Sequence, residues 1–195
     1  IVVPKSEIQQ KLGVSLGKGV MDEVIYTAGG GVVEAQMKEN YGGAFLMDEN
    51  EHAEPMFHML SGTIRPRHGE EAATNGGLIY ANESGIFKMT GGVIENGAAV
   101  TGEGGAILGS ANSKILIHGG MIRNCKAKSH GGAIKSTGIV EIKNASIIGC
   151  FAEKDGGAVY VTKKLTMENA TISGNISNHW GGGIAAAGAT VTAED

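Results

Sequence analysis

Glu103, His130 and Asp155 are residue types that can do chemistry together, and each stands directly before a pair of glycines. Their spacings along the chain are 27 and 25 residues. Two carboxylates on either side of an imidazole can ligate a metal ion or transfer protons. They form such a site only if the fold stacks equivalent positions of successive segments. A row of solvated polar residues is the alternative interpretation of the same positions.

Trp180 occupies the same place before the following glycine pair, with His179 next to it. An indole at such a corner either contacts a sugar ring or a partner surface, or packs into the corner. We therefore predict Glu103, His130, Asp155 and Trp180 as binding residues. We predict no catalytic residue, no metal site and no cofactor.

Two cysteines, Cys125 and Cys150, occupy equivalent positions 25 residues apart. Two are too few for a disulfide scaffold, and no neighbouring base would make either thiol a nucleophile. We predict that they are small buried residues stacked in a ladder. A disulfide between them is the alternative, and the sequence leaves that choice open.

The glycine pairs mark a repeat whose period converges on 25 residues, since the successive intervals are 34, 28, 27, 25 and 25. Between the pairs, apolar and polar residues alternate over short stretches such as "KILIH" and "LTM", as they do in strands. Turns rich in Gly, Asn and Ser separate these stretches. The pairs begin at Gly42, Gly76, Gly104, Gly131, Gly156 and Gly181.

Three short strands per repeat describe one coil of a parallel β-helix. We predict an all-β, right-handed parallel β-helix of about five to six coils, because parallel crossovers strongly prefer the right hand. Residues at equal positions should form ladders across neighbouring coils, about 4.8 Å apart. The predicted core columns are Ile64, Ile94, Ile122, Ile147 and Ile172; Met59, Met89, Ile117, Ile142 and Met167; Phe57, Phe87, Ile115, Val140 and Leu165; and Phe45, Ile79, Ile107, Ile134, Val159 and Ile184.

The two ends of the chain depart from the repeat. Residues 1–41 are predicted to form an N-terminal cap, with a short helix at Ser6–Leu12 and two lead-in strands, "EVIYTA" and "GVVEAQM". Residues 42–195 are predicted to form the β-helix, with an acidic loop inserted at Asp48–Pro55. The last coil is incomplete, and the first residues resemble a processed end or an excised fragment.

An incomplete last coil leaves strand edges that another chain can pair with. Ile184 and Val191 lie in that coil, and Val191 continues the column of Leu165. We predict Ile184 and Val191 as a self-association edge, covered by a partner or by a second copy stacked head to tail into a filament. The alternative is that the chain is a fragment of a longer protein.

The composition excludes several classes of protein. Of the 195 residues, 33 are Gly and only 3 are Pro, which fits neither collagen nor a disordered chain. The formal net charge is −4 and no basic run is present, so no nucleic-acid partner is predicted. No apolar stretch is long enough to predict a membrane-spanning helix.

Three segments resemble a known surface-protein repeat: "IRNCKAKSHGGAI" from Ile122, "IIGCFAEKDGGAV" from Ile147 and "ISGNISNHWGGGI" from Ile172. They are similar to repeats of the chlamydial polymorphic outer-membrane proteins and related bacterial surface passengers. In that family, an apolar residue and an Asn precede Gly-Gly-Ala-Ile. Ile stands here at the apolar position, and of the five coils only the last keeps the Asn, as Asn175.

This resemblance covers about Gly42 to Ile184 and implies an extracellular or bacterial cell-surface β-helix with an adhesive role. We therefore predict a non-enzymatic structural or adhesive protein that self-associates end to end, with a glycan or a host surface as a further partner. The alternative is an enzyme of the pectate-lyase-like β-helix class acting on a polysaccharide. That alternative requires acidic residues from separate coils to converge.

Overall fold

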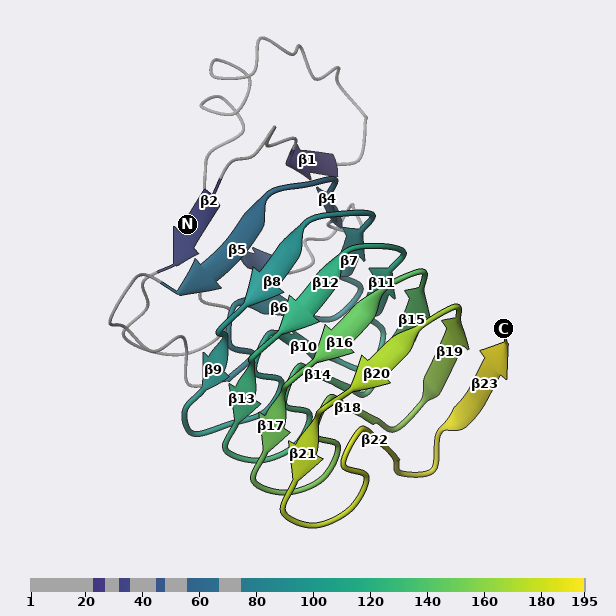
Figure 1. Ribbon diagram of the computed structural model, residues 1–195. Coiled ribbons are helices and arrows are strands. Elements are labelled where there is room, and N and C mark those ends of the chain that lie inside the picture. The colour runs from purple at the N-terminus through teal and green to yellow at the C-terminus, as the bar shows by residue number, and fades with distance from the viewer. Residues whose placement is uncertain (1–22, 27–31, 36–44, 48–55, 67–74, 195) are drawn as a thin grey trace, which may run out of the picture.

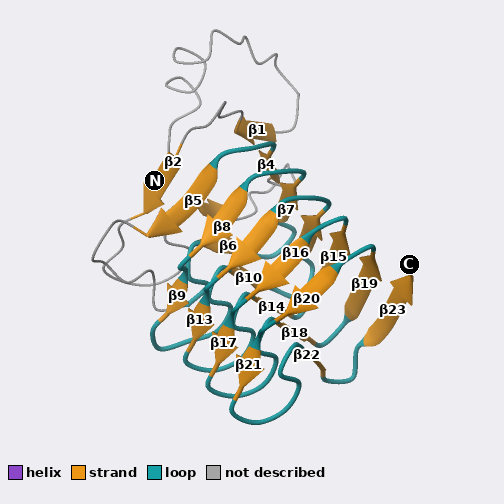
Figure 2. Cartoon of the chain, viewed as in Figure 1, coloured by secondary structure: helices purple, strands orange, loops and turns teal. Residues whose placement is uncertain are grey.

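The computed structural model describes residues 23–26, 32–35, 45–47, 56–66 and 75–194. These residues form strands and turns without any helix, wound into a parallel β-helix of about five coils (Figures 1 and 2). The predicted all-β parallel β-helix is therefore confirmed. The predicted helix at Ser6–Leu12 and the predicted acidic loop at Asp48–Pro55 lie outside the described residues. No helix that could span a membrane occurs in the described ranges.

Four parallel sheets run along the solenoid. The first contains β1 (Glu23–Tyr26), β4 (Met56–Met59), β7 (Ile86–Met89), β11 (Lys114–Ile117), β15 (Ile139–Lys143), β19 (Lys164–Glu168) and β23 (Thr190–Glu194). The second contains β2 (Val32–Ala35), β5 (Thr63–Pro66), β8 (Val93–Glu95), β12 (Met121–Arg123), β16 (Ser146–Ile148) and β20 (Thr171–Ser173). The third contains β9 (Ala98–Ala99), β13 (Lys126–Ala127), β17 (Phe151–Ala152) and β21 (Ile176–Ser177). The fourth contains β3 (Phe45–Met47), β6 (Ile79–Ala81), β10 (Ile107–Gly109), β14 (Ile134–Ser136), β18 (Val159–Val161) and β22 (Ile184–Ala186).

A complete coil passes through one strand of each sheet, for example β11, β12, β13 and β14 (Figure 1). The prediction of three strands per coil was wrong by one. The additional strands β9, β13, β17 and β21 are each two residues long, so they carry no alternation that a sequence pattern could reveal. The lead-in strands predicted near the N-terminus are confirmed as β1 and β2, which pair with β4 and β5.

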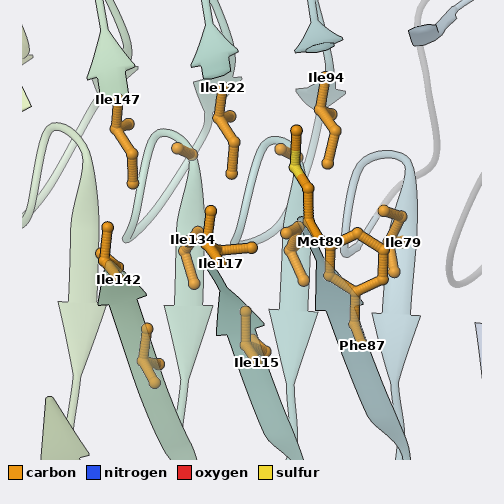
Figure 3. Packing of buried hydrophobic residues seen from close by; sticks show 14 of the residues in the cluster. Ile79, Phe87, Met89, Ile94, Ile115, Ile117, Ile122, Ile134, Ile142 and Ile147 are labelled. Carbon is orange, nitrogen blue, oxygen red and sulfur yellow. The ribbon is translucent and has the colours of Figure 1, made fainter. Parts of the chain in front are cut away.

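The core consists of the predicted columns, stacked in register from coil to coil. Ile122 pairs with Ile94 on one side and with Ile147 on the other. Ile115 likewise pairs with Phe87 and Val140. All six side chains are fully buried. Figure 3 labels five of them: Ile94, Ile122, Ile147, Ile115 and Phe87. Each coil therefore completes the core of its neighbours, and aliphatic ladders replace the large aromatic side chains that this chain largely lacks.

The glycine pairs are required by the corner that leads into the fourth sheet. Gly156, the first of its pair, has φ +71°, a conformation that side chains with a Cβ rarely adopt. At Gly157, the second, a Cβ atom would lie 2.0 Å from the carbonyl oxygen of Gly182 in the next coil. The first glycine turns the chain and the second lets two coils approach, which explains why the pair recurs.

Candidate functional site

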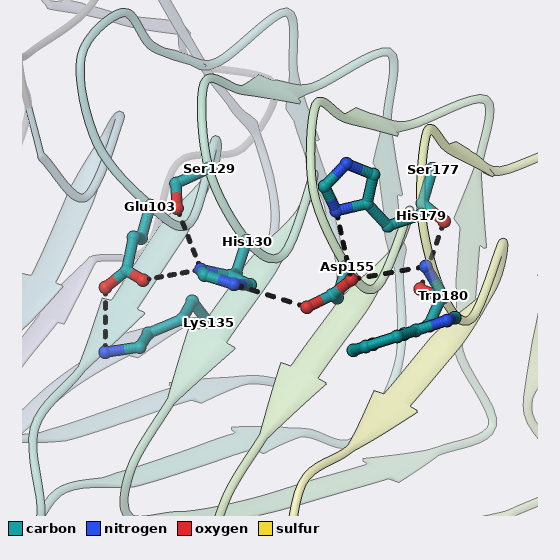
Figure 4. A network of polar contacts seen from close by, with 8 residues as sticks. All are labelled: Glu103, Ser129, His130, Lys135, Asp155, Ser177, His179 and Trp180. Carbon is teal, nitrogen blue, oxygen red and sulfur yellow. Dashed lines mark hydrogen bonds and ion pairs between the residues drawn. The ribbon is translucent and has the colours of Figure 1, made fainter.

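The predicted binding residues form one polar rim along the corner where the glycine pairs begin. The first glycine of each pair donates a backbone hydrogen bond to the carbonyl of the residue before the next pair. Gly104 N–H donates to His130 O at 3.0 Å, Gly131 N–H to Asp155 O at 3.0 Å, and Gly156 N–H to Trp180 O at 2.9 Å. Glu103, His130, Asp155 and Trp180 therefore stack in consecutive coils, as predicted, and we call them the polar rim (Figure 4).

His130 lies at the centre of the polar rim and contacts a carboxylate on each side. Its Nδ1 is 2.9 Å from Glu103 Oε1, in the preceding coil. Its Nε2 is 3.3 Å from Asp155 Oδ2, in the following coil. All three side chains are less than one third exposed. The imidazole thus links three coils through side-chain contacts.

Three further residues complete this network, and sequence reasoning missed all of them. Lys135 Nζ lies 2.9 Å from Glu103 Oε2, and Ser129 Oγ lies 2.8 Å from His130 Nδ1. The Tyr160 ring packs against the imidazole, with centroids 4.5 Å apart. Lys135 and Tyr160 are paired outward positions of β14 and β18. The alternation of inward and outward residues in these strands could have identified both as surface residues. They were missed because neither directly precedes a glycine pair, the position from which the site was predicted.

The environment of Glu103 stabilises its charged form. Burial by itself raises the pKa of Glu103, but the hydrogen bond and charge of Lys135, followed by those of His130, outweigh it. The net result is a pKa below the ordinary value for glutamate. Glu103 is therefore an ionised member of a paired network at neutral pH, which is unlike a carboxyl group prepared to donate a proton.

The geometry of the polar rim does not suit metal binding. The two ring nitrogens of His130 face different carboxylates, in opposite directions, so the three side chains do not converge on a common point. Among the described residues, no group of three or more His, Cys, Asp or Glu side chains is arranged to hold a metal ion.

Ser129, His130 and Asp155 have the residue types of a nucleophile, base and acid. A site for acyl transfer also needs backbone N–H groups that can stabilise an oxyanion. The nearby backbone N–H groups instead donate to carbonyl oxygens of neighbouring coils. These donors are the N–H groups of Lys128, Ser129, Gly131 and Gly132. The sheet ladder therefore already uses these four donors.

Trp180 ends the described rim with an indole that is 78% exposed. Packing into the corner, one of the two alternatives from the sequence, is therefore wrong. The backbone of Trp180 is held on both sides: its N–H donates to Asp155 Oδ1 at 3.2 Å, and its carbonyl accepts from Ser177 Oγ at 3.0 Å (Figure 4). His179 Nδ1 lies 3.9 Å from the same Asp155 oxygen. An exposed aromatic side chain is thus presented on a fixed backbone.

The cysteines are free and buried, at the corner between the second and third sheets. Cys125 and Cys150 are each 1% exposed. In the next coil Asn175 takes their place, accepting a hydrogen bond from Cys150 N–H at 2.8 Å and donating one to Ile147 O at 3.0 Å. Asn175, the residue that the bacterial surface repeats also carry at this position, therefore joins the last coil to the preceding one.

Contacts between charged or titratable side chains of neighbouring coils also occur outside the polar rim, as the following two examples show. His118 Nε2 lies 3.0 Å from Glu141 Oε2. Glu141 of β15 pairs in register with Leu116, so its side chain reaches His118 diagonally. Glu95 accepts hydrogen bonds from Arg123 at 2.7 and 2.9 Å and lies 3.9 Å from Arg65. A column gives the direct neighbours of a residue but not its diagonal ones.

One shallow groove of about 220 Å³ lies on the outer side of the third sheet, and no residue of the polar rim lines it. Its walls include the Lys128–Glu153 ion pair, 2.8 Å long, and the Phe151 side chain. The lining residues are Ala99, Val100, Lys126, Ala127, Lys128, Phe151 and Glu153.

No protein-family model, no curated protein and no solved structure matches this chain. The evidence for the parallel β-helix is therefore the repeat pattern of the sequence and the structure itself. The resemblance to bacterial surface repeats stays a prediction.

Proposed function

We propose that this chain is a structural, non-enzymatic β-helix that associates end to end through its last described coil. One observation carries the proposal: apolar positions that are fully buried in the inner coils are open to solvent in this coil. Leu165 is fully buried, whereas Val191, paired with it, is 45% exposed. Ile172 and Ile184 are also only partly buried, although Ile147 and Val159, with which they pair, are fully buried.

The backbone of the same coil supports this proposal. β20, β21, β22 and β23 are each the outermost strand of their sheet, so the four sheets end together (Figure 1). Such edges present unpaired N–H and C=O groups that can pair with a further strand. Ile184 and Val191, the predicted self-association residues, lie in β22 and β23.

A second copy of this chain is the occupant that this end fits best. The last coil is shaped like the coil below it, with which β20, β22 and β23 pair in parallel and in register. It would therefore accept one more coil of the same shape. At the opposite end of their sheets, β1, β2 and β3 are also outermost strands. A heterologous contact between the two ends would repeat without closing and form a filament.

The extracellular, adhesive part of this proposal depends on the repeat resemblance. A surface rod would present the side chains of its four sheets to a glycan or to a host protein. The alternative is an enzyme acting on a polysaccharide, and it needs two carboxylates that face one substrate. Glu103 and Asp155 instead face His130 between them, which favours the structural role.

The test compares the wild-type chain with Val191→Lys, which places a charge on the exposed end. Light scattering after size-exclusion chromatography gives the mass, and negative-stain electron microscopy gives the length of the rods. The matched control is Ile148→Lys, an outward apolar position of the inner strand β16. We expect wild-type and control rods that lengthen with concentration, and monomers for Val191→Lys.

Wild-type protein that stays monomeric up to its solubility limit would overturn the self-association proposal. Equal loss of assembly in Val191→Lys and Ile148→Lys would place the contact elsewhere. Depolymerisation of an acidic polysaccharide that Glu103→Gln abolishes would replace the structural role by the enzymatic alternative.

A further inference from the structure

Cys125 and Cys150 occupy the same corner of consecutive coils. Cys125 lies between β12 and β13, and Cys150 lies between β16 and β17. The backbone on both sides of this corner is joined in register, because Phe151 N–H donates to Cys125 O at 2.9 Å and Asn124 N–H donates to Ile148 O at 3.0 Å. Adjacent parallel strands lie about 4.8 Å apart. Disulfide-bonded cysteines have Cα atoms about 4.4 to 6.8 Å apart.

The two thiols also point in the same direction. Each Sγ lies near the carbonyl oxygen of the residue two positions earlier, at 3.3 Å from Arg123 O and 3.6 Å from Ile148 O. No other cysteine exists in the sequence, so each has a single intramolecular partner.

We propose that Cys125 and Cys150 form a disulfide when the chain folds in an oxidising environment, which closes one coil into a covalent ring. A small-molecule disulfide such as oxidised glutathione is the oxidant. One cysteine thiolate attacks it, forms a mixed disulfide and releases one glutathione thiol. The second cysteine then attacks the protein sulfur of the mixed disulfide and releases the other glutathione. Two protein thiols are oxidised and one glutathione disulfide is reduced to two thiols.

Because both cysteine side chains are buried in the folded chain, we expect the disulfide to form during folding and not afterwards. Both side chains are 1% exposed, which leaves no room for glutathione beside the closed coil. Burial raises the pKa of the Cys125 thiol well above its ordinary value, whereas the neighbouring Cys125 lowers the pKa of the Cys150 thiol. Access of the oxidant, and not ionisation of the thiols, is therefore what limits the reaction. A reduced folded chain should therefore oxidise slowly, and the disulfide, once formed, should resist reduction.

The expected consequence is greater stability of the stacked coils. The bond would join residues 25 positions apart, which is the length of one repeat. Closing a loop of this size restricts the unfolded chain and should lower the unfolding equilibrium constant about a hundredfold. This effect does not depend on end-to-end association.

The test unfolds the full chain in urea and refolds it in a buffer of oxidised and reduced glutathione. Intact mass, free-thiol titration and peptide mapping follow the cysteines, and urea unfolding followed by circular dichroism gives the stability. Reduced wild-type protein is the first control, because its sequence is identical. Cys150→Ala is the second, since it leaves one thiol without its partner.

We expect a folded monomer lighter by two hydrogen atoms, without free thiols, with a Cys125–Cys150 peptide and a higher urea midpoint than the reduced chain. Addition of a reductant should lower that midpoint to the value of the reduced chain. Three results would overturn the proposal: two free thiols after refolding, glutathione adducts or intermolecular disulfides in their place, or an oxidised chain without the β-helix spectrum.

Discussion

The inner coils and the last described coil carry aliphatic residues at the same core positions, yet these residues differ in burial. Ile122 and Ile147 are fully buried, whereas Ile172, the next residue of their column, is only partly buried. Leu165 and Val191 differ in the same way, with 0% and 45% exposure. The core of a β-helix coil is therefore supplied by the coil above and the coil below, and not by its own side chains.

The energetic consequence is that equal substitutions should have unequal costs along the solenoid. A buried side chain in an inner coil has partners on both sides. Its counterpart in the last described coil has them on one side and water on the other. Paired substitutions in one column test this difference directly, because the residue type and the local backbone are the same.

The largest difference is expected between Ile122→Ala and Ile172→Ala. Ile122 is fully buried, and its truncation leaves a cavity that neighbouring coils cannot fill, at a cost of about 2–5 kcal/mol. Ile172 is already partly open to solvent, so its truncation should cost less than about half as much. Urea unfolding followed by circular dichroism measures both. Equal losses would contradict the view that neighbouring coils supply the burial.

The second pair is Gly157→Ala and Gly182→Ala, which occupy one position of the glycine pair in successive coils. A Cβ at Gly157 would lie 2.0 Å from Gly182 O and 2.6 Å from Ile176 O, both of them backbone atoms. We expect a loss of about 1–3 kcal/mol or more, as for overpacking. At Gly182 the nearest atom, Asn175 O, is 3.5 Å away, an ordinary contact.

Gly182→Ala should therefore leave the unfolding midpoint close to that of the wild type. Size-exclusion chromatography of both variants checks that each remains compact. A Gly182→Ala variant as destabilised as Gly157→Ala would mean that a coil of a second copy covers this end under the conditions of the measurement, as end-to-end association requires.

A third prediction concerns the polar rim and acid. Because the pKa of Glu103 is lower in the folded chain than its ordinary value near 4.5, the unfolded chain binds more protons between those two values. The contribution of Glu103 to stability is therefore present above pH 4.5 and is lost as the pH falls through the folded pKa. Glu103→Gln should reduce the stability at pH 7 and flatten its fall as the pH drops below the ordinary value of 4.5.

Urea midpoints of both chains across this pH range give the measurement. Lys135→Met is the matched variant, because Lys135 is the main partner that lowers the Glu103 pKa. It should flatten the same fall while leaving the carboxylate in place. An unchanged acid dependence in both variants would mean that the rim does not hold Glu103 in its charged form.

The smallest effect is expected at the Lys128–Glu153 ion pair of the third sheet. The two side chains are 58% and 40% exposed, so water and salt screen their attraction. Lys128→Ala should change the free energy of unfolding by less than about 1 kcal/mol. A double-mutant cycle with Glu153→Ala, at low and high salt, isolates the pair. A coupling above that value would show that water and salt do not screen this pair as its exposure implies.

Sequence reasoning succeeded where a contact joins equal positions of the repeat. Aligning the repeats on one recurring position is enough to obtain the columns of Ile122 and Ile115. The same alignment gives the order of Glu103, His130 and Asp155. Sequence reasoning failed where a contact is diagonal or crosses between columns. Lys135 reaches Glu103 from β14, and Glu141 reaches His118 from β15, because long side chains extend beyond the position that their backbone occupies.

The sequence by itself determined the repeat, the inward columns and the stacking of both the polar rim and the cysteines. Side chains of a strand alternate with a period of two, and each coil has nearly the same number of residues. A single alignment of the repeats therefore shows which residues stack on one another in every ladder. The tertiary structure decided which side chains meet and which remain exposed. Those outcomes depend on the coils above and below, on side-chain reach and on the corner geometry. They place two carboxylates around one imidazole, join Asn175 to the backbone of the coil beneath it, and leave Trp180 open to solvent.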